Sequence, residues 1–314
     1  MSEDKKLSLI ERAVSRSVDP ASLQRSRLDG PDDGQSGAPQ EGVASVDPRA
    51  TPARPEQPSQ RRWELDLARL EADGFLVPAD GRSQLAEEFR MIKRPLLSNA
   101  FGTGATLVAD GNLIMVTSTY PSEGKTFTAI NLAMSLAKEI GKTVMLVDAD
   151  VGRSSFHRVL GTPSSPGLID ALLDQHLSLG DIIIETNIPN LRILPKGRSH
   201  NLANELLASS SMARITRELA DRYPDRIIVF DSPPLLITNE AVALSAHMGQ
   251  IVFVIEAERT VQSAVKEALG LLDADKPIGL VLNKARRPVG GDFYGHYGHY
   301  GYYGYSDRAE GATA

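Results

Sequence analysis

The segment TYPSEGKT, residues 119–126, contains the residue types that bind the phosphate chain of a nucleotide. Its last three residues, Gly124, Lys125 and Thr126, form the end of a P-loop, where backbone N–H groups and a helix amino terminus face the phosphates. Lys125 is suited to the β- and γ-phosphates, and the Thr126 hydroxyl to Mg²⁺. The sequence therefore predicts binding of ATP with Mg²⁺. The expected ATP contacts come from Pro121, Ser122, Glu123, Gly124, Lys125, Thr126 and Phe127.

The loop departs from the common P-loop pattern at several positions. Thr119 stands at the usual first glycine, and Ser122 stands where a third glycine often lies. P-loop ATPases that partition DNA or position division sites have a second lysine at the place of Tyr120. The absence of that lysine argues against this class.

Three acidic residues follow apolar runs that read as buried strands. Asp148 and Asp150 end VMLVDAD, and Asp231 ends IIVFD. Each alone could cap a helix or close a turn, but carboxylates at the carboxyl ends of strands share the ligand-binding edge of an α/β sheet. On strands expected to flank the P-loop strand, they favour Mg²⁺ and its waters. We expect Thr126 to bind the ion directly and Asp150 and Asp231 to act through water, which leaves Asp148 to accept a proton from an attacking hydroxyl.

The elements that position these residues alternate along the chain from residue 112. Continuous Val/Ile/Leu runs predict strands buried on both faces, and helical patterns separate them. The expected strands are 112–118, 142–150, 190–195, 226–234, 250–257 and 277–284, and the expected helices are 126–141, 201–223 and 259–274. This order predicts an α/β P-loop NTPase fold, with a mostly parallel sheet covered by helices on both faces.

Composition places limits on the rest of the chain. Of 314 residues, 41% are hydrophobic and none is cysteine, so disulfides and thiolate metal sites are excluded. A net charge of −6 argues against a nucleic-acid partner. With no apolar run of membrane-spanning length, we expect a cytoplasmic protein that a partner recruits to the inner face of the membrane. The expected organisation is a short docking helix or frayed end at 1–19, a disordered linker at 20–60, a helical segment at 61–100, the P-loop core at 101–288 and a flexible tail at 289–314.

Two further segments stand out. GGDFYGHYGHYGYYGYSD, residues 290–307, contains six of the eight tyrosines: Tyr294, Tyr297, Tyr300, Tyr302, Tyr303 and Tyr305. Such a Gly/Tyr segment is either a flexible substrate or an aggregation-prone tract. In the helical stretch SQLAEEFRMIKRPLLSNA, Glu87, Arg90 and Lys93 recur every three residues, which is either a contact surface or a solvated charged face.

The three motifs TSTYPSEGKTFTAINLA, VMLVDADVGRSSFHRVLG and RIIVFDSPPLLITNEA resemble the Walker A, A′ and B segments of bacterial tyrosine autokinases. These are the cytoplasmic kinases of exopolysaccharide and capsule assembly systems. The resemblance covers roughly residues 80–288 and is strengthened by LPKGRSHNLANELLAS. LSLIERAVSR and EEFRMIKRPLL are most similar to the branch associated with exosortase systems.

The resemblance implies a role for each motif residue. Lys125 and Thr126 match the ATP-binding pair, Asp148 the proposed base, and Asp150 and Asp231 the Mg²⁺ carboxylates.

Glu87, Arg90 and Lys93 match the family's E-x-x-R-x-x-R helix, which docks into a neighbouring subunit of a ring. Lysine at the last position keeps the charge but lacks the bidentate fork of arginine. The family usually has an arginine one residue after Val151, but here that place is Gly152 and Arg153 follows. For Arg153, an interface salt bridge and a plain surface charge both stay open.

The family pattern also implies the reaction and the partners. The tail tyrosines are substrates of a neighbouring subunit in the homo-oligomer, and a separate transmembrane chain-length-determinant protein activates the kinase. Other protein-tyrosine substrates are implied, as is control of exopolysaccharide or capsule polymerisation and export. The alternatives are a partitioning or positioning ATPase of the ParA/MinD type, and a nucleotide-dependent scaffold without catalysis. The scaffold would lack the base, whereas Asp148 is present.

Overall fold

The computed structural model describes residues 61–78, 83–103, 107–153, 155–222 and 225–286. The six tail tyrosines, the expected linker and the expected docking helix lie outside these residues. The strands are β1 (Arg61–Trp63), β2 (Leu113–Ser118), β3 (Thr143–Asp148), β4 (Ile184–Thr186), β5 (Leu191–Leu194), β6 (Arg226–Asp231), β7 (Gln250–Glu256) and β8 (Ile278–Asn283). The helices are α2 (Leu67–Ala72), α3 (Gln84–Phe101), α4 (Lys125–Leu136), α5 (Phe156–Leu160), α6 (Leu168–Leu173), α7 (Leu179–Ile182), α8 (Ala203–Leu207), α9 (Ser210–Arg222), α10 (Asn239–Ser245) and α11 (Gln262–Leu269).

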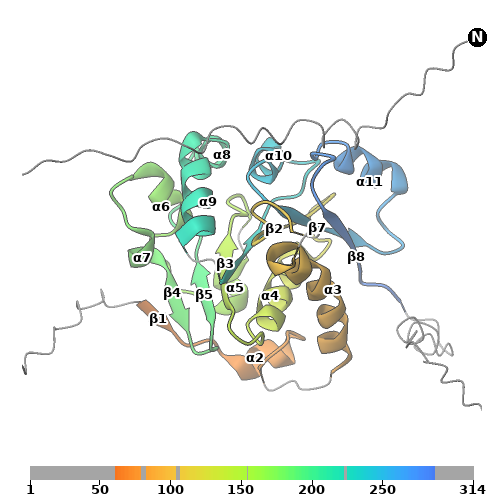
Figure 1. Ribbon diagram of the computed structural model, residues 1–314, viewed down its shortest axis with the longest axis horizontal. Helices are drawn as coiled ribbons and strands as arrows, with labels where there is room; N and C mark the ends of the chain where they lie inside the picture. The colour runs from red at the N-terminus through yellow and green to blue at the C-terminus, as the bar shows by residue number, and fades with distance from the viewer. Residues whose placement is uncertain (1–60, 79–82, 104–106, 154, 223–224, 287–314) are drawn as a thin grey trace, which may run out of the picture. The chain divides into compact units, whose positions relative to one another are not determined.

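The eight strands form one sheet in the order β1-β4-β5-β3-β6-β2-β7-β8 (Figure 1). In sheet order, the six neighbouring strands β5, β3, β6, β2, β7 and β8 are parallel to one another. Their carboxyl ends therefore meet at one edge of the sheet. β4 pairs antiparallel with β5, and β1 pairs parallel with β4. The mostly parallel α/β sheet predicted from the apolar runs is confirmed.

Alternate residues of the central strands pack into two separate cores. On β2, Leu113 and Met115 join the core beneath α6, α8, α9 and α10, while Ile114 and Val116 join the core beneath α2, α3 and α4. This alternation explains why β2 is apolar at both faces. Helices cover both sides of the sheet, and the binding residues are left at its edge.

Three local features differ from the sequence expectations. Residues 61–63 form an edge strand, although a helical pattern was expected from residue 61. The helix expected over 201–223 is two helices, α8 and α9, because the Ser209 hydroxyl donates to the carbonyl of Leu206 at 2.7 Å and competes with the helical ladder. β3 is not adjacent to the P-loop strand β2, since β6 lies between them; only Asp231 therefore lies on a strand that flanks it.

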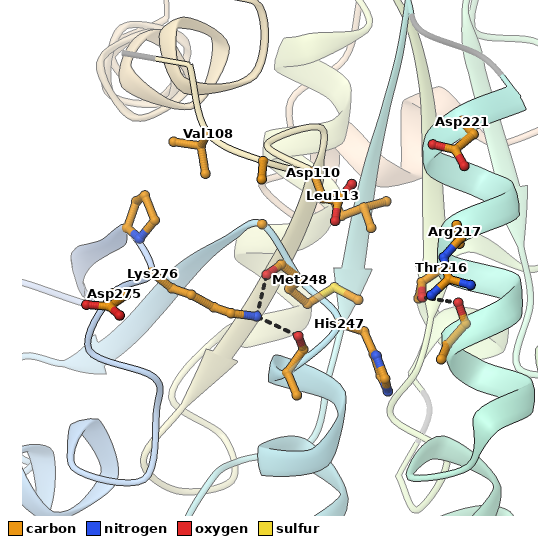
Figure 2. A pocket seen from close by; sticks show the side chains of 15 residues that line it. Val108, Asp110, Leu113, Thr216, Arg217, Asp221, His247, Met248, Asp275 and Lys276 are labelled. Atoms are coloured by element: carbon orange, nitrogen blue, oxygen red, sulfur yellow. Dashed lines mark hydrogen bonds between the residues drawn. The ribbon is translucent and has the colours of Figure 1, made fainter. Parts of the chain in front are cut away.

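The amino-terminal edge of the sheet holds a cavity of about 570 Å³ (Figure 2). It is lined by Leu113, the first residue of β2, whereas the P-loop follows the last residue of that strand. The Lys276 ammonium donates to the carbonyls of Ser245, Ala246 and Met248, each at 2.7 Å, at the end of α10. These bonds use all three ammonium donors and satisfy the helix terminus. Burial lowers the pKa of Lys276, against the opposing charges of Asp273 and Asp110. Lys276 therefore fixes the entry to β8 and has no donor left for a ligand.

Candidate nucleotide and phosphoryl-transfer site

The P-loop connects β2 to α4 at the carboxyl edge of the sheet. Its turn requires left-handed backbone at Ser122, with φ of 70°, and at Gly124, with φ of 104°. A Cβ on Gly124 would lie 2.0 Å from the Nδ2 atom of Asn283, so only glycine fits there. The loop is therefore shaped both by its own backbone and by the end of β8.

Glu123 belongs to the predicted ATP-binding set, and its side chain is used inside the loop. It is 1% exposed, and its carboxylate accepts the backbone N–H of Tyr120 at 2.8 Å and the hydroxyl of Thr260. Thr260 precedes α11, so this contact connects the P-loop to the segment after β7. The part of Glu123 left for a phosphate is its backbone N–H.

Two residues at the end of β8 hold the loop from the other side. Asn283 donates to the carbonyl of Glu123 at 2.8 Å, and Lys284 donates to the carbonyl of Ser122 at 2.7 Å. These hydrogen bonds hold the loop carbonyls on the β8 side, which leaves the loop N–H groups available to phosphates on the opposite side. Sequence reasoning missed Thr260, Asn283 and Lys284, although polar residues ending the last apolar strand gave the same signal that identified the aspartates.

The remaining loop residues differ in exposure. Pro121 and Phe127 are half-buried and Ser122 is exposed. The ring centroid of Phe127 lies 5.1 Å from that of Phe75, so the Phe127 ring packs against the segment that follows α2. Of the predicted ATP-binding set, only Lys125 and Thr126 have side chains directed at the acidic cluster.

Thr126 and Asp231 form the shortest contact of this cluster. The Thr126 hydroxyl donates to Oδ2 of Asp231 at 2.6 Å, across the gap between α4 and β6. Asp231 is fully buried, and its Oδ1 atom has no hydrogen-bond partner among the described residues. Burial raises the pKa of Asp231 to about 8; Asp148 and Asp150 add to the rise, while Thr126 and Lys125 oppose it. A hydroxyl and a buried carboxylate with an unsatisfied oxygen fit a divalent cation.

Lys125 and Asp150 form an ion pair beside this contact. The ammonium lies 3.6 Å from Oδ2 of Asp150, and both side chains are buried. The other oxygen of Asp150 accepts the backbone N–H of Arg153 at 3.1 Å. Arg153 thus contributes its backbone to the turn after β3, and the residue itself is exposed.

Asp148 lies opposite Asp231 in the register of β3 and β6. It is 1% exposed, and the backbone N–H of Ala149 donates to the Asp231 carbonyl at 2.9 Å. The structure therefore brings Asp148, Asp150 and Asp231 to one edge together with Lys125 and Thr126. No group of three or more His, Asp or Glu side chains in the described part of the chain is already arranged as a complete metal site.

The three residues of the predicted subunit-contact helix separate on α3. Glu87 and Arg90 form an exposed ion pair at 2.6 Å. Lys93 is 6% exposed, and its ammonium donates to the carbonyl of Ser135 at 2.8 Å and pairs with Glu139 at 2.6 Å. The structure places the Lys93 charge inside the subunit, at the end of α4, and leaves only the other two on the surface.

A further buried carboxylate, Asp170 on α6, lies beside the loop that follows β5. Asp170 accepts the backbone N–H groups of Gly167 at 2.9 Å and Arg198 at 3.1 Å, and the Arg198 side chain at 2.5 Å. Burial would raise the pKa of Asp170, but these donors outweigh it and lower the pKa. Gly197 lies so close that a Cβ would be 2.3 Å from Asp170. These contacts fix the LPKGRSHN loop, and its Lys196 ammonium lies 3.5 Å from the carbonyl of Val151 in the A′ segment.

Comparison with known proteins identifies the family. Residues 112–270 match a family model described as an AAA domain. The tyrosine-protein kinase CpsD of Streptococcus agalactiae is 31% identical over 191 residues, which cover 59% of this chain and 81% of that protein. The chain belongs to the family of bacterial tyrosine-protein kinases.

Other relatives of the kinase agree. The tyrosine-protein kinase wzc of Salmonella typhimurium is 30% identical over 195 residues, although the kinase spans only 27% of its length. The crystal structure of the chimerical protein CapA2B2 is 28% identical, has a TM-score of 0.58 and matches 67% of the kinase and 88% of that chain. None of the described helices of the kinase is long and apolar enough to cross a membrane.

Proposed function

We propose that the kinase transfers the γ-phosphoryl group of ATP to tyrosines of its own C-terminal segment on a neighbouring subunit. The observation that supports this best is the convergence of the Thr126–Asp231 contact, the Lys125–Asp150 ion pair and Asp148 at the carboxyl edge of the sheet. The substrates are Tyr294, Tyr297, Tyr300, Tyr302, Tyr303 and Tyr305.

Each residue of the site has a task in this reaction. The N–H groups of the P-loop and the Lys125 ammonium bind the phosphates, and Lys125 exchanges its partner Asp150 for a phosphate oxygen. Thr126, Asp231 and Asp150 would hold Mg²⁺, in part through water, and the bound ion would supply positive charge beside the phosphates. Asp231 would hold the cation as a carboxylate, so it would have to lose the proton that burial favours in the ligand-free site.

Asp148 serves as the base. Its carboxylate accepts the proton of the tyrosine hydroxyl as the tyrosine oxygen bonds to the γ-phosphorus. The bond from that phosphorus to the β–γ bridging oxygen breaks, and ADP leaves. Because Asp148 lies opposite Asp231 on the adjacent strand, the proton acceptor and the cation site are next to each other.

The exposed Glu87–Arg90 pair supports the proposed contact between subunits in a ring. A chimerical relative, CapA2B2, supports the proposal that this kinase acts with a second polypeptide, a transmembrane protein of the chain-length-determinant type. In that setting the kinase would work at the inner face of the membrane and regulate polymerisation and export of a capsule or exopolysaccharide. Other proteins would be phosphorylated on tyrosine as well.

The test is phosphotyrosine mapping by mass spectrometry after incubation with MgATP, with and without the cytoplasmic part of a candidate partner. Modified tail tyrosines are expected, and Lys125→Met should abolish them. Replacing the six tail tyrosines by phenylalanine should leave ATP binding unchanged. ATP turnover with an unmodified tail in both conditions would contradict the kinase proposal and would favour the positioning ATPase.

A further inference from the structure

An apolar groove of about 640 Å³ lies between α3 and β8, which we call the α3–β8 groove. Its α3 side is lined by Leu85, Phe89 and Ile92, and its β8 side includes Val281 and Leu282. Figure 1 shows β8 as the last strand of the sheet, with α3 beside it. The groove is thus bounded on one side by a helix and on the other by an open strand edge.

The rim of the groove is unusually apolar for a surface. Met91 on α3 is 61% exposed, and Leu280 and Leu282, which alternate with Val281 and so lie on the other face of β8, are 58% and 63% exposed. Among the described residues β8 pairs only with β7, so its outer backbone N–H and C=O groups face away from the sheet. An extended peptide laid along β8 would satisfy these groups and bury the apolar rim.

We propose that the tyrosine-rich segment of the same chain, residues 292–305, binds in the α3–β8 groove while it is unphosphorylated. The segment follows directly: Asn283, the last residue of β8, lines the groove, and eight residues separate it from Asp292. Those residues include Pro288, Gly290 and Gly291, which suit the reversal of direction that pairing beside β8 requires. The short connection gives an effective concentration on the order of millimolar.

The chemistry of the segment matches the groove. Seven of its fourteen residues are aromatic, Phe293 and the six tyrosines, and Asp292 is its only acidic residue. An extended strand turns alternate side chains to the same face. In an extended strand, the even-numbered residues Tyr294, Tyr300 and Tyr302 would face one side. The odd-numbered residues Phe293, Tyr297, Tyr303 and Tyr305 would face the other. Either register therefore supplies at least three rings to the groove.

Phosphorylation would reverse the binding. A phosphotyrosine carries nearly two negative charges, and transfer of these charges to an apolar groove that also contains Glu88 is unfavourable. The glycines make ordering of the segment costly, so the bound form is only modestly favoured even before phosphorylation. Addition of phosphate then releases the segment and exposes the groove. This step rests on the proposed function, because it takes the tail tyrosines as substrates.

Hydrogen–deuterium exchange of the full chain tests the proposal. Phosphatase-treated protein should show amide exchange in 278–286 about tenfold slower than a variant in which Phe293 and the six tyrosines are serine. The matched control replaces the six tyrosines by phenylalanine, which keeps the rings and removes the phosphate acceptors. It should retain the slow exchange even in the presence of MgATP, whereas phosphorylated wild-type protein should exchange like the serine variant.

The outcomes separate the possible failures. Equal exchange in the serine and phenylalanine variants would overturn the docking proposal whether or not the tail is phosphorylated. Slow exchange that disappears on dilution, together with a fall in mass by light scattering, would mean that a second copy covers the groove, which also overturns it. An unmodified tail with slow exchange in the phenylalanine variant would contradict only the proposed function and the release step.

Discussion

Lys93 offers a decisive test, because its position in the sequence pattern and its position in the structure lead to different expectations. The pattern places it on a subunit-contact helix, whereas the structure buries its ammonium at the carboxyl end of α4. There it donates to the Ser135 carbonyl, one of the groups that a helix terminus leaves without an intrahelical partner. We therefore predict that Lys93→Met destabilises the subunit without weakening assembly.

The magnitude follows from the contacts. A hydrogen bond from a charged donor contributes about 1.5–3 kcal/mol, and a cation at a helix carboxyl terminus adds about 0.3–1 kcal/mol. The Glu139 side chain is 36% exposed, so its attraction to the ammonium is partly screened and its lost partner is replaced by water. Methionine fills the space of the lysine stem. The expected loss is about 2–3 kcal/mol, which lowers the melting temperature by roughly 4–12 °C for a domain of this size.

The assay is thermal unfolding without nucleotide, combined with light scattering to measure the mass of the assembly. Arg90→Met is the matched control, since Arg90 lies one turn away and its ion pair with Glu87 is exposed. An exposed pair of this kind contributes about 0–1 kcal/mol, so the control should unfold near the wild-type temperature and show the smaller assembly mass. A Lys93→Met protein with wild-type melting and reduced mass would refute the assignment.

Three further predictions concern the site. Thr260→Val removes the hydroxyl bonded to Glu123 and should weaken ATP binding about tenfold by titration calorimetry, with Thr260→Ser restoring it and kcat nearly unchanged. Because the pKa of Asp231 is raised to about 8, the ligand-free carboxyl keeps its proton below that pH, so MgATP affinity should rise as pH increases from 6 to 8 and then level off. Calorimetry in buffers of different ionisation enthalpy should show release of one proton, and Asp231→Asn should lose both the slope and the release. The lowered pKa of Asp170 means that its charge stabilises the fold above the unfolded-state pKa and that this contribution is lost as pH falls, so Asp170→Asn should cost about 2 kcal/mol at pH 7 and less at pH 4 in urea unfolding.

The central sheet could be predicted from sequence because its strands are buried on both faces. A run such as LIMVTS in β2 needs no partner to be recognised, and the polar residues that end such runs mark the binding edge. The same logic identified Asp148 and Asp231. The apolar runs do not predict the order of the strands in the sheet. Because β6 lies between β2 and β3, only β6, which ends in Asp231, is adjacent to the P-loop strand on that side.

Features that depend on distant partners could not be predicted. β1 and β4 have three residues each, too few to show a period, and they are recognisable only by their pairing. The burial of Lys93 depends on Glu139, 46 positions away, and lysine at a helical three-residue spacing reads as surface charge. The P-loop pattern also does not show that the Glu123 carboxylate bonds to the hydroxyl of Thr260, 137 positions away.

The arrangement of α3 explains how one helix can serve several contacts. With 100° between successive residues, Phe89 and Lys93 face the core, Glu87 and Arg90 face solvent, and Ile92 faces β8. The surface proposed for subunit contact and the surface proposed for tail binding are therefore different sides of the same helix. A tail held in the α3–β8 groove leaves the charged side free, so a ring could assemble before its tails are phosphorylated. Since the groove also reaches the first turn of α4, release of the tail would expose an apolar surface directly beside the nucleotide site.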